Sequence, residues 1–242
     1  MKRTGFIFLA VALLCFWTGC VSAGKKALRT QKDPIALVSV VSNWDINWKG
    51  EDSLNPDNIG PLAKRTLRED PDMVVVSNAD ELINTAEVLI RDIMAGSGLI
   101  NLVDKQTVLL SRAYREAKIN RYQINQELVK PGDYQFIDFR DKNFPPALAA
   151  ETGIQRSMYV EFEFTKSIGT GFGKFGNCRA LVDMSILILD ARGKKLYRTT
   201  VSLGSRTTTK VMNGVYSGTG LMGLFDSAIT DACYDFLDQL QK

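Results

Sequence analysis

Histidine is absent from the 242-residue chain, and cysteine is scarce. Without histidine, neither a Ser-His-Asp triad nor a Cys-His pair can form, and every histidine-containing metal site is excluded. Of the four cysteines, Cys15 and Cys20 lie close to the N-terminus, so only Cys178 and Cys233 remain, too few for a thiolate zinc site. We therefore expect a protein that is not an enzyme, with no metal site and no cofactor.

A large charge of one sign is missing as well. The formal net charge is +3, and Lys2 and Arg3 supply two of these charges. The rest of the chain is close to neutral, which predicts neither a nucleic-acid partner nor a strongly acidic one. Apolar residues make up 45% of the chain and charged residues 24%, as in ordinary globular domains.

The first 24 residues differ in composition from the rest. Lys2 and Arg3 precede an uncharged run from Gly5 to Trp17. This run is shorter than the about 20 residues that a membrane-spanning helix needs, but it fits the core of a secretory signal. The order of basic, apolar and small residues favours a signal peptide over the alternative, a buried N-terminal helix or strand.

Two processing sites compete at the end of this signal. Thr18-Gly19-Cys20 resembles the lipobox of bacterial lipoproteins, in which the cysteine thiol receives a diacylglycerol and becomes the new N-terminus. Trp17 stands where that motif usually has leucine. The alternative is Val21-Ser22-Ala23, small residues that favour ordinary cleavage before Gly24. We favour lipidation at Cys20, because Gly-Cys follows the apolar run directly, and acyl chains such as palmitate hold a domain at a membrane surface.

The chain is therefore expected to have three parts. Residues 1–19 are the signal peptide, residues 20–33 a lipidated tether, and residues 34–242 a single globular envelope domain. The expected location is the periplasmic side of the outer membrane. In that compartment Cys178 and Cys233 either form one disulfide or are small buried apolar side chains, and the sequence leaves both alternatives open.

Hydrophobic periodicity predicts an α/β (α+β) fold: one mixed, largely antiparallel sheet with amphipathic helices packed on it. Strands are expected at residues 35–41, 100–103, 134–137, 158–165, 180–189 and 196–203. Helices are expected from Ser77 or Asn78 to about 94, from 104 onward, at 145–151 and at 225–240. A loop with short helical pieces is expected at 43–72, unless the alternating residues 43–48 extend the first strand, and further loops are expected at 166–178 and 204–220.

Two glycine-rich segments are unusual. Residues 171–176 match G-x-G-x-x-G, but a strand follows them instead of the helix that a dinucleotide site needs. We expect a hairpin loop that exposes Phe172 and Phe175 to a partner or to lipid headgroups. Residues 211–224 are expected either to pack as a loop beside the last helix or to touch a membrane or a second copy. The contact residues expected in this second segment are Val211, Met212, Leu221 and Met222.

Several phrases follow one another in an order that resembles a known group of lipoprotein domains. They are IALVSVV at 35–41, SGLINLVDKQTVLL at 97–110, ALAAETGIQRSMYVEFEF at 147–164, LILDARGKKLYRTTVSL at 187–203 and FDSAITDACYDFLDQL at 225–240. This order is similar to the periplasmic domain of curli-secretion-type lipoproteins, to the lipoprotein activators of peptidoglycan synthases, and to the N-terminal domain of the Tol-system translocation protein. The resemblance covers about residues 35–240, while 43–72 and 119–143 depart from it. It implies envelope assembly, secretion or regulation of a partner.

These observations predict a membrane-anchored bacterial envelope lipoprotein that acts as a non-catalytic interaction or assembly module. An envelope protein partner or self-association is expected. The alternative is a membrane-active lipoprotein whose amphipathic segments insert into the bilayer surface.

Overall fold

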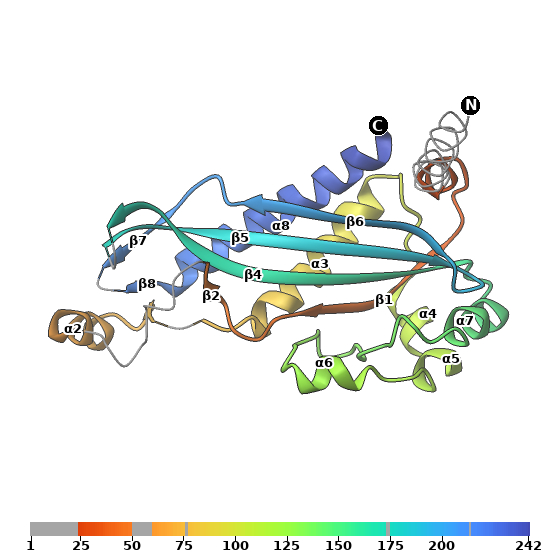
Figure 1. Cartoon of the computed structure of the whole chain (residues 1–242), viewed down its shortest axis with the longest axis horizontal. Coiled ribbons are helices and arrows are strands. Elements are labelled where there is room, and N and C mark those ends of the chain that lie inside the picture. The colour runs from red at the N-terminus through yellow and green to blue at the C-terminus, as the bar shows by residue number, and fades with distance from the viewer. Residues whose placement is uncertain (1–23, 50–59, 76, 173–174, 213) are drawn as a thin grey trace, which may run out of the picture.

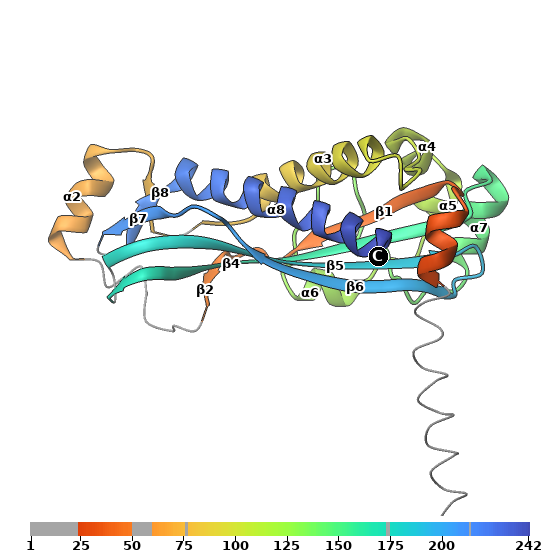
Figure 2. The ribbon, with the colours of Figure 1, turned by 90° about the horizontal axis from the view of Figure 1, so that it is seen from above.

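A computed structural model describes residues 24–49, 60–75, 77–172, 175–212 and 214–242, but not the side chain of Phe172. The predicted signal peptide and Cys20 lie outside the described residues. Figures 1 and 2 show one long, twisted sheet with two long helices on one face and several short helices at one edge. None of the described helices combines the length and the apolar composition needed to cross a membrane.

Two long strands form the centre of the sheet. β4 (Arg156–Phe172) and β5 (Phe175–Asp190) pair antiparallel from end to end. β1 (Ile35–Ser42) and the short β2 (Asn47–Trp48) run parallel to β4. The predicted fold class, a mixed and largely antiparallel sheet with packed helices, is confirmed.

The free edge of β5 carries two strands in succession. β6 (Lys195–Gly204) pairs with the C-terminal half of β5, and β7 (Thr209–Met212) pairs with its first residues. β8 (Val215–Ser217) pairs with β7, and β3 (Met73–Val74) follows beside β8. This end of the sheet is therefore built from segments far apart in the sequence.

The two long helices cover one face of the sheet (Figure 2). α3 (Asp80–Gly96) and α8 (Gly218–Gln241) pack side by side there. The hydrophobic core lies between these helices and the sheet. Side chains alternate between the two faces of a strand, so every second side chain of β5 points toward α8 and is buried. These inward side chains are Cys178, Ala180, Val182, Met184, Ile186 and Ile188.

Four short helices lie along the β1 edge. They are α4 (Lys105–Leu109), α5 (Arg112–Arg115), α6 (Arg121–Asn125) and α7 (Phe144–Thr152). Short helices cover one face of β1 and the main core beneath α3 covers the other, so β1 is buried on both faces, as its continuous apolar run predicts. The short helix predicted at 145–151 is confirmed by α7. The predicted strands at 100–103 and 134–137 are wrong, because those segments contribute only isolated bridges at Leu102 and Ile137.

Helix caps explain where the predicted helix from residue 104 departs from the structure. The Asp104 carboxylate accepts the backbone N–H of Thr107 and starts α4, as expected. Ser111 then accepts the N–H of Tyr114 at 3.2 Å and starts a new helix, α5. A second N-cap within a few residues breaks one expected helix into two.

Two of the predicted loops are also wrong. Much of 166–178 belongs to β4 and β5, because cross-strand pairing satisfies the backbone even where glycine lowers strand propensity. Residues 211–224 belong mainly to β7, β8 and the start of α8. That helix begins at Gly218 because Ser217 Oγ accepts the N–H of Gly220 at 2.8 Å and the Asp72 carboxylate accepts that of Thr219 at 2.9 Å. Asp72 also accepts a hydrogen bond from the Ser217 hydroxyl, and this bond, together with the one from the Thr219 N–H, holds the pKa of Asp72 below its usual value.

Candidate functional site

The hairpin end of β4 and β5 forms an exposed apolar tip, defined here by Phe175 and Met212. The two residues are cross-strand partners on β5 and β7. Their side chains are 53% and 51% exposed, respectively. α2 (Pro61–Glu69) packs on β3 and β8 at the same end of the molecule (Figure 1). The tip is therefore a small apolar surface at one extreme of the sheet.

The other predicted contact residues are placed differently. Val211 and Leu221 are buried in the main core, so they are not available for contact in this structure. Met222 is half-buried and packs against the same core. The physical reason is regular structure: Val211 points inward from β7 where Met212 points outward, and Leu221 lies on the buried face of α8. Phe172 ends β4.

A hollow beside α6 is a surface that the sequence did not predict. It is lined by Lys118, Ile119, Asn120, Arg121, Tyr122, Asp138 and Arg140. Ile119 and Tyr122 are both exposed large side chains. Arg140 Nε lies 3.1 Å from Asp138 Oδ1, which fixes one wall. Exposed tyrosine and arginine together are the composition that protein–protein interfaces favour.

The α6 hollow exists because two segments that are not part of the sheet meet there. Asn120 caps α6, its side chain accepting the N–H of Tyr122, and its backbone N–H donates to the carbonyl of Phe136. An isolated bridge joins Ile119 to Ile137. The sequence did not predict this hollow. The region is marked there only as a polar stretch, residues 119–143, that departs from the expected order of elements.

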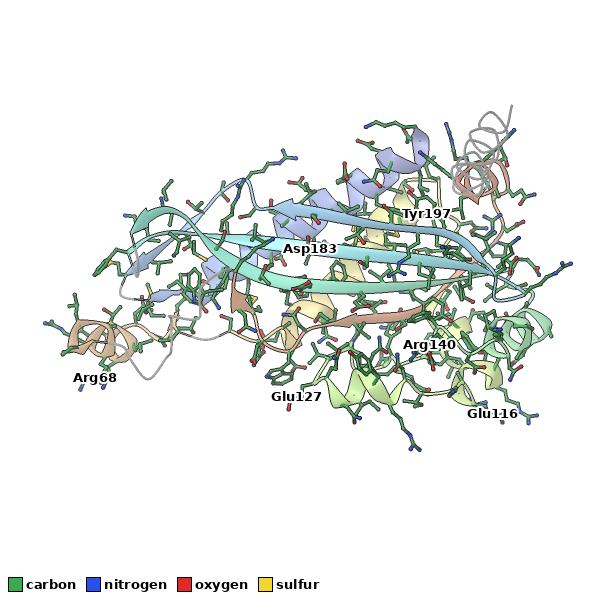
Figure 3. The ribbon with its side chains drawn as sticks, in the orientation of Figure 1. Arg68, Glu116, Glu127, Arg140, Asp183 and Tyr197 are labelled. Carbon is green, nitrogen blue, oxygen red and sulfur yellow. The ribbon has the colours of Figure 1, made fainter. Side chains whose placement is uncertain are left out.

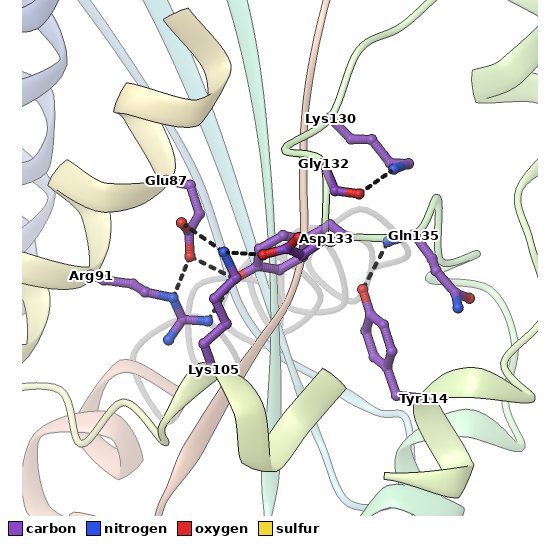
Figure 4. Close-up of polar contacts among 9 residues, drawn as sticks. Glu87, Arg91, Lys105, Tyr114, Lys130, Gly132, Asp133 and Gln135 are labelled. Atoms are coloured by element: carbon purple, nitrogen blue, oxygen red, sulfur yellow. Dashed lines mark hydrogen bonds and ion pairs between the residues drawn. The ribbon is translucent and has the colours of Figure 1, made fainter. Parts of the chain in front are cut away.

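A buried network of charged groups holds this region to the fold. Glu87 on α3 is buried and lies within ion-pair distance of Arg91 and of Lys105, whose Nζ is 3.3 Å away. The Tyr134 hydroxyl donates to Glu87 Oε1 at 3.0 Å and accepts from Arg91 at 2.6 Å. Lys105 also reaches Asp133, at 3.2 Å (Figure 4). Burial is the main cause that raises the pKa of Tyr134, so the phenol stays protonated. The network links α3, the start of α4 and the segment that follows α6.

A second buried charge lies beneath the apolar tip. Lys166 on β4 is buried, and its Nζ donates to the carbonyl of Ile46. The same Nζ lies 5.2 Å from the ring centres of both Trp48 and Tyr216. No carboxylate of the described residues forms an ion pair with it. Burial lowers the pKa of Lys166 to about 8.

The two remaining cysteines are free thiols on facing elements of the main core. Cys178 lies on β5 and Cys233 on α8, and both are fully buried. Burial raises the pKa of Cys178 to about 11 and that of Cys233 to about 12. Of the two alternatives that the sequence left open, the structure therefore has small buried side chains rather than a disulfide.

A small cavity of about 60 Å³ lies between the α6 segment and the face of the sheet opposite α8. The Tyr159 hydroxyl and Gln123 Oε1 are buried at its wall and have no hydrogen-bond partner among the described residues. Glu161 is the one carboxylate among its described lining residues, so no acid–base pair converges there. Across the described residues, no group of three or more His, Cys, Asp or Glu side chains is placed to hold a metal ion.

At the opposite end of the molecule, the structure of residues 24–33 differs from the tether that the sequence predicts. Residues 24–30 form a helix, and Leu28 from it is buried in the main core. Gly24 is so close to β6 that a Cβ atom there would lie 1.7 Å from the carbonyl oxygen of Leu196. Arg29 donates to the backbone carbonyl of Gln241 at the end of α8. The part of the predicted tether from 24 onward therefore packs on the fold.

A single buried arginine fixes this N-terminal segment. Arg156, the first residue of β4, is 3% exposed. Its guanidinium donates to the carbonyls of Gln31 at 2.9 Å and Ala27 at 3.3 Å, and to the Asp33 carboxylate at 2.8 Å. It therefore caps the carbonyl end of the helix with a positive charge, which also interacts favourably with the helix dipole.

Comparisons with known proteins add little to this geometry. No protein-family model matches the chain, and no curated protein matches it. The chain is structurally similar to the LpoB C-terminal domain from Salmonella enterica, with a TM-score of 0.29 and 12% identity over 77% of this chain and 97% of that one. It is also similar to lipoprotein GNA1162 from Neisseria meningitidis, with a TM-score of 0.34 and 13% identity over 86% and 99% of the two chains. At these values the likeness supports no statement about function, which has to be argued from the chain's own residues.

The buried network predicts a large stability effect at Glu87. Glu87→Gln removes the buried negative charge but leaves the partly buried Arg91 and Lys105 without it, so we expect the free energy of unfolding to fall by about 3 kcal/mol. Denaturant unfolding measures the change. Glu69→Gln, in the exposed pair with Arg65, is the matched control and is expected to cost at most about 1 kcal/mol. Equal small losses in both variants would show that the Glu87 network does not stabilise the fold.

The lowered pKa of Lys166 predicts a pH-dependent stability. Above pH 8 the folded chain gives up this proton, whereas the unfolded chain keeps it up to its ordinary pKa of 10.5, so the unfolded state binds more protons in this interval. The contribution of Lys166 to the free energy of unfolding therefore increases with pH between 8 and 10. At pH 7, Lys166→Met is expected to be more stable than the wild type by up to roughly 3 kcal/mol.

Unfolding curves of both proteins between pH 7 and 10 test this expectation. Only the difference between them reports on Lys166, because the raised thiol pKa values of Cys178 and Cys233 act in the opposite direction in both proteins. The advantage of the variant should shrink as the pH rises. A constant difference over this range would contradict a lysine that titrates near pH 8.

Proposed function

We propose that this chain is an exported envelope lipoprotein, acylated at Cys20, that works by binding a protein partner and catalyses no reaction itself. The proposal starts from the sequence: a basic and apolar signal followed directly by Gly-Cys. It places the protein at the periplasmic side of the outer membrane. Secretion or assembly of envelope components is the process that the resemblance implies.

The observation that carries the partner-binding proposal is the α6 hollow. Tyr122 is 62% exposed at its rim, and Arg121 and Arg140 lie beside it. Leaving an aromatic ring in water next to two arginines has no benefit for folding, whereas such residues dominate binding energy when a partner covers them. Short hydrogen-bonded turns hold Tyr122 in place, which lowers the entropy lost on binding.

The apolar tip is the second surface with a specific observation in its favour. Phe175 and Met212 form an exposed cross-strand pair at the end of the molecule. Such a surface suits a partner protein, or the bilayer in the alternative of a membrane-active lipoprotein. We define it by only two exposed side chains, whereas the α6 hollow brings a tyrosine and two arginines together, so we rank it second.

Membrane attachment is expected to depend on one thiol. Cys20→Ala removes the only acyl acceptor of the proposed lipobox, so palmitate incorporation should be lost and the protein should move from the membrane fraction to the soluble fraction. Metabolic labelling and fractionation of whole cells measure both effects. Cys15→Ala, inside the proposed signal peptide, is the control and should leave both unchanged. Membrane retention and labelling of Cys20→Ala would exclude the lipid anchor.

Partner binding is expected to depend on Tyr122. Tyr122→Ala should lose its crosslinked protein partner in intact envelopes, because truncation of an interface tyrosine weakens binding by about 2 kcal/mol or more, roughly thirty-fold. Tyr234→Ala is the matched control, since Tyr234 on α8 is 56% exposed and lies outside the α6 hollow. Crosslinking followed by pull-down of the lipidated protein is the measurement.

A third variant separates the two surfaces. If the partner survives Tyr122→Ala but is lost with Phe175→Ser/Met212→Ser, the contact lies at the tip and the α6 hollow is not the site. Crosslinks from the tip to lipid instead of protein would support the membrane-active alternative. Identical partner recovery from all three variants would contradict binding through either surface.

A further inference from the structure

One end of the molecule concentrates exposed basic residues from three separate segments. The helix at 24–30 touches the carbonyl of Leu196 through Gly24, and Arg29 reaches the backbone of Gln241. A hollow between Ala27 and Arg192 brings the turn before β6 to the same place. The exposed basic residues that these contacts gather are Lys26, Arg29, Arg192, Lys194, Lys195 and Lys242.

Two acidic side chains of this region, Asp33 and Asp190, are engaged within the fold, whereas Asp238 on α8 is exposed. Asp33 pairs with the buried guanidinium of Arg156. Asp190 accepts the backbone N–H groups of Arg192 at 2.9 Å and Lys194 at 2.8 Å and so closes the turn. Among the described residues, none of the six exposed basic side chains forms an ion pair. This end therefore presents positive charge to the solvent, although the chain as a whole is nearly neutral.

Covalent geometry places the same end close to the proposed lipid anchor. Three residues separate Cys20 from Gly24, and an extended chain advances at most about 3.6 Å per residue. Gly24 must then stay within about 15 Å of the acylated thiol. Because residues 24–33 are packed on the fold, the globular part cannot drift further from the bilayer.

We infer that this basic end is a membrane-facing surface that binds the headgroups of anionic phospholipids, an inference that rests on the proposed acylation of Cys20. Charge complementarity identifies the occupant, because the negatively charged surface of an anionic bilayer attracts basic residues. At physiological ionic strength this attraction extends over a Debye length of about 8 Å, so it acts on residues that the anchor holds near the headgroups. The lipid anchor supplies proximity, and the basic end sets the orientation of the sheet relative to the bilayer.

The inference is tested by measuring how the lipidated protein is oriented on vesicles. Ala191→Cys, in the turn at the basic end, carries a fluorescent donor, and the vesicles carry a headgroup-labelled acceptor. Cys178 and Cys233 are buried and do not compete for the label. We expect efficient energy transfer on vesicles that contain phosphatidylglycerol, and a marked loss on pure phosphatidylcholine or in about 1 M salt, where the Debye length falls to about 3 Å.

Charge reversal supplies the decisive comparison. Lys26→Glu/Lys194→Glu/Lys195→Glu should lose the lipid and salt dependence of the transfer. The matched control reverses Lys64, Arg68 and Lys210, exposed basic residues of α2 and β7 at the far end of the sheet, where Figure 3 labels Arg68. The control should behave like the wild type. Transfer that is unchanged by reversal of the basic end, or equal on both kinds of vesicle, overturns the inference.

Flotation separates this inference from the proposed function. Pure phosphatidylcholine vesicles retain the protein only through its acyl chains, so failure to float with them counts against acylation of Cys20. In that case the same variants are floated with phosphatidylglycerol vesicles, where the unacylated chain binds only through basic residues. Binding that the triple reversal abolishes would support the basic surface without the anchor, and absence of binding would overturn it.

Discussion

The antiparallel pairing of β4 with β5 is the interaction on which the rest of the structure depends. Backbone pairs run from Arg156 opposite Asp190 to Phe172 opposite Phe175, with one register shift between Ile168 and Thr170. The first residue of this hairpin caps the N-terminal helix, and the last ones carry the apolar tip. The two ends of the molecule are thus joined by one continuous ladder of hydrogen bonds. The strands β1, β2, β6 and β7, and the long helix α8, are placed by direct contact with that ladder.

Two of the buried charged residues, Glu87 and Lys166, show how differently a fold can accommodate ionic groups. Glu87 is surrounded by Arg91, Lys105 and the Tyr134 hydroxyl, so its desolvation is offset by several charge-assisted contacts. Lys166 has a backbone carbonyl and two aromatic rings in place of a carboxylate. Cation–π contacts are weaker than a paired carboxylate, so its ammonium form remains unfavourable. The first group stabilises a junction between segments, whereas the second reduces stability beneath the tip.

The sequence predicted the elements whose signal is local. The apolar run at 35–41, the strand at 158–165 and the helix at 225–240 all specify their structure within a short window. The hairpin arm at 166–178 could not be predicted, because its partner β7 lies in a segment with no strand alternation of its own. The docked helix at 24–30 was missed for a similar reason. Its composition is polar and basic, and the group that fixes it, Arg156, lies on β4.

The candidate surfaces illustrate the same limit. Phe175 and Met212 were predicted from composition, and alternation along β7 then decides that Met212 is exposed while Val211 is buried. Nothing local distinguishes Tyr122 from Tyr234 in the sequence. Their difference arises only when Ile119 and Ile137 pair and bring Arg140 beside α6. Sequence patterns therefore predict which residues can be exposed, and tertiary contacts decide which of them share a surface.

A docked N-terminal segment changes what a lipid anchor would do for this fold. A free tether of 14 residues has a root-mean-square length of roughly 20 Å and lets a domain adopt any orientation. With residues 24–33 held by Arg156, an anchor at Cys20 would leave only residues 21–23 between the lipid and the packed segment, so most of that freedom would be lost. The α6 hollow lies on the β1 edge, between the two ends (Figure 1). A partner bound there would meet the sheet from the side while the anchored end stayed at the bilayer, so membrane contact and partner contact would not compete for the same residues.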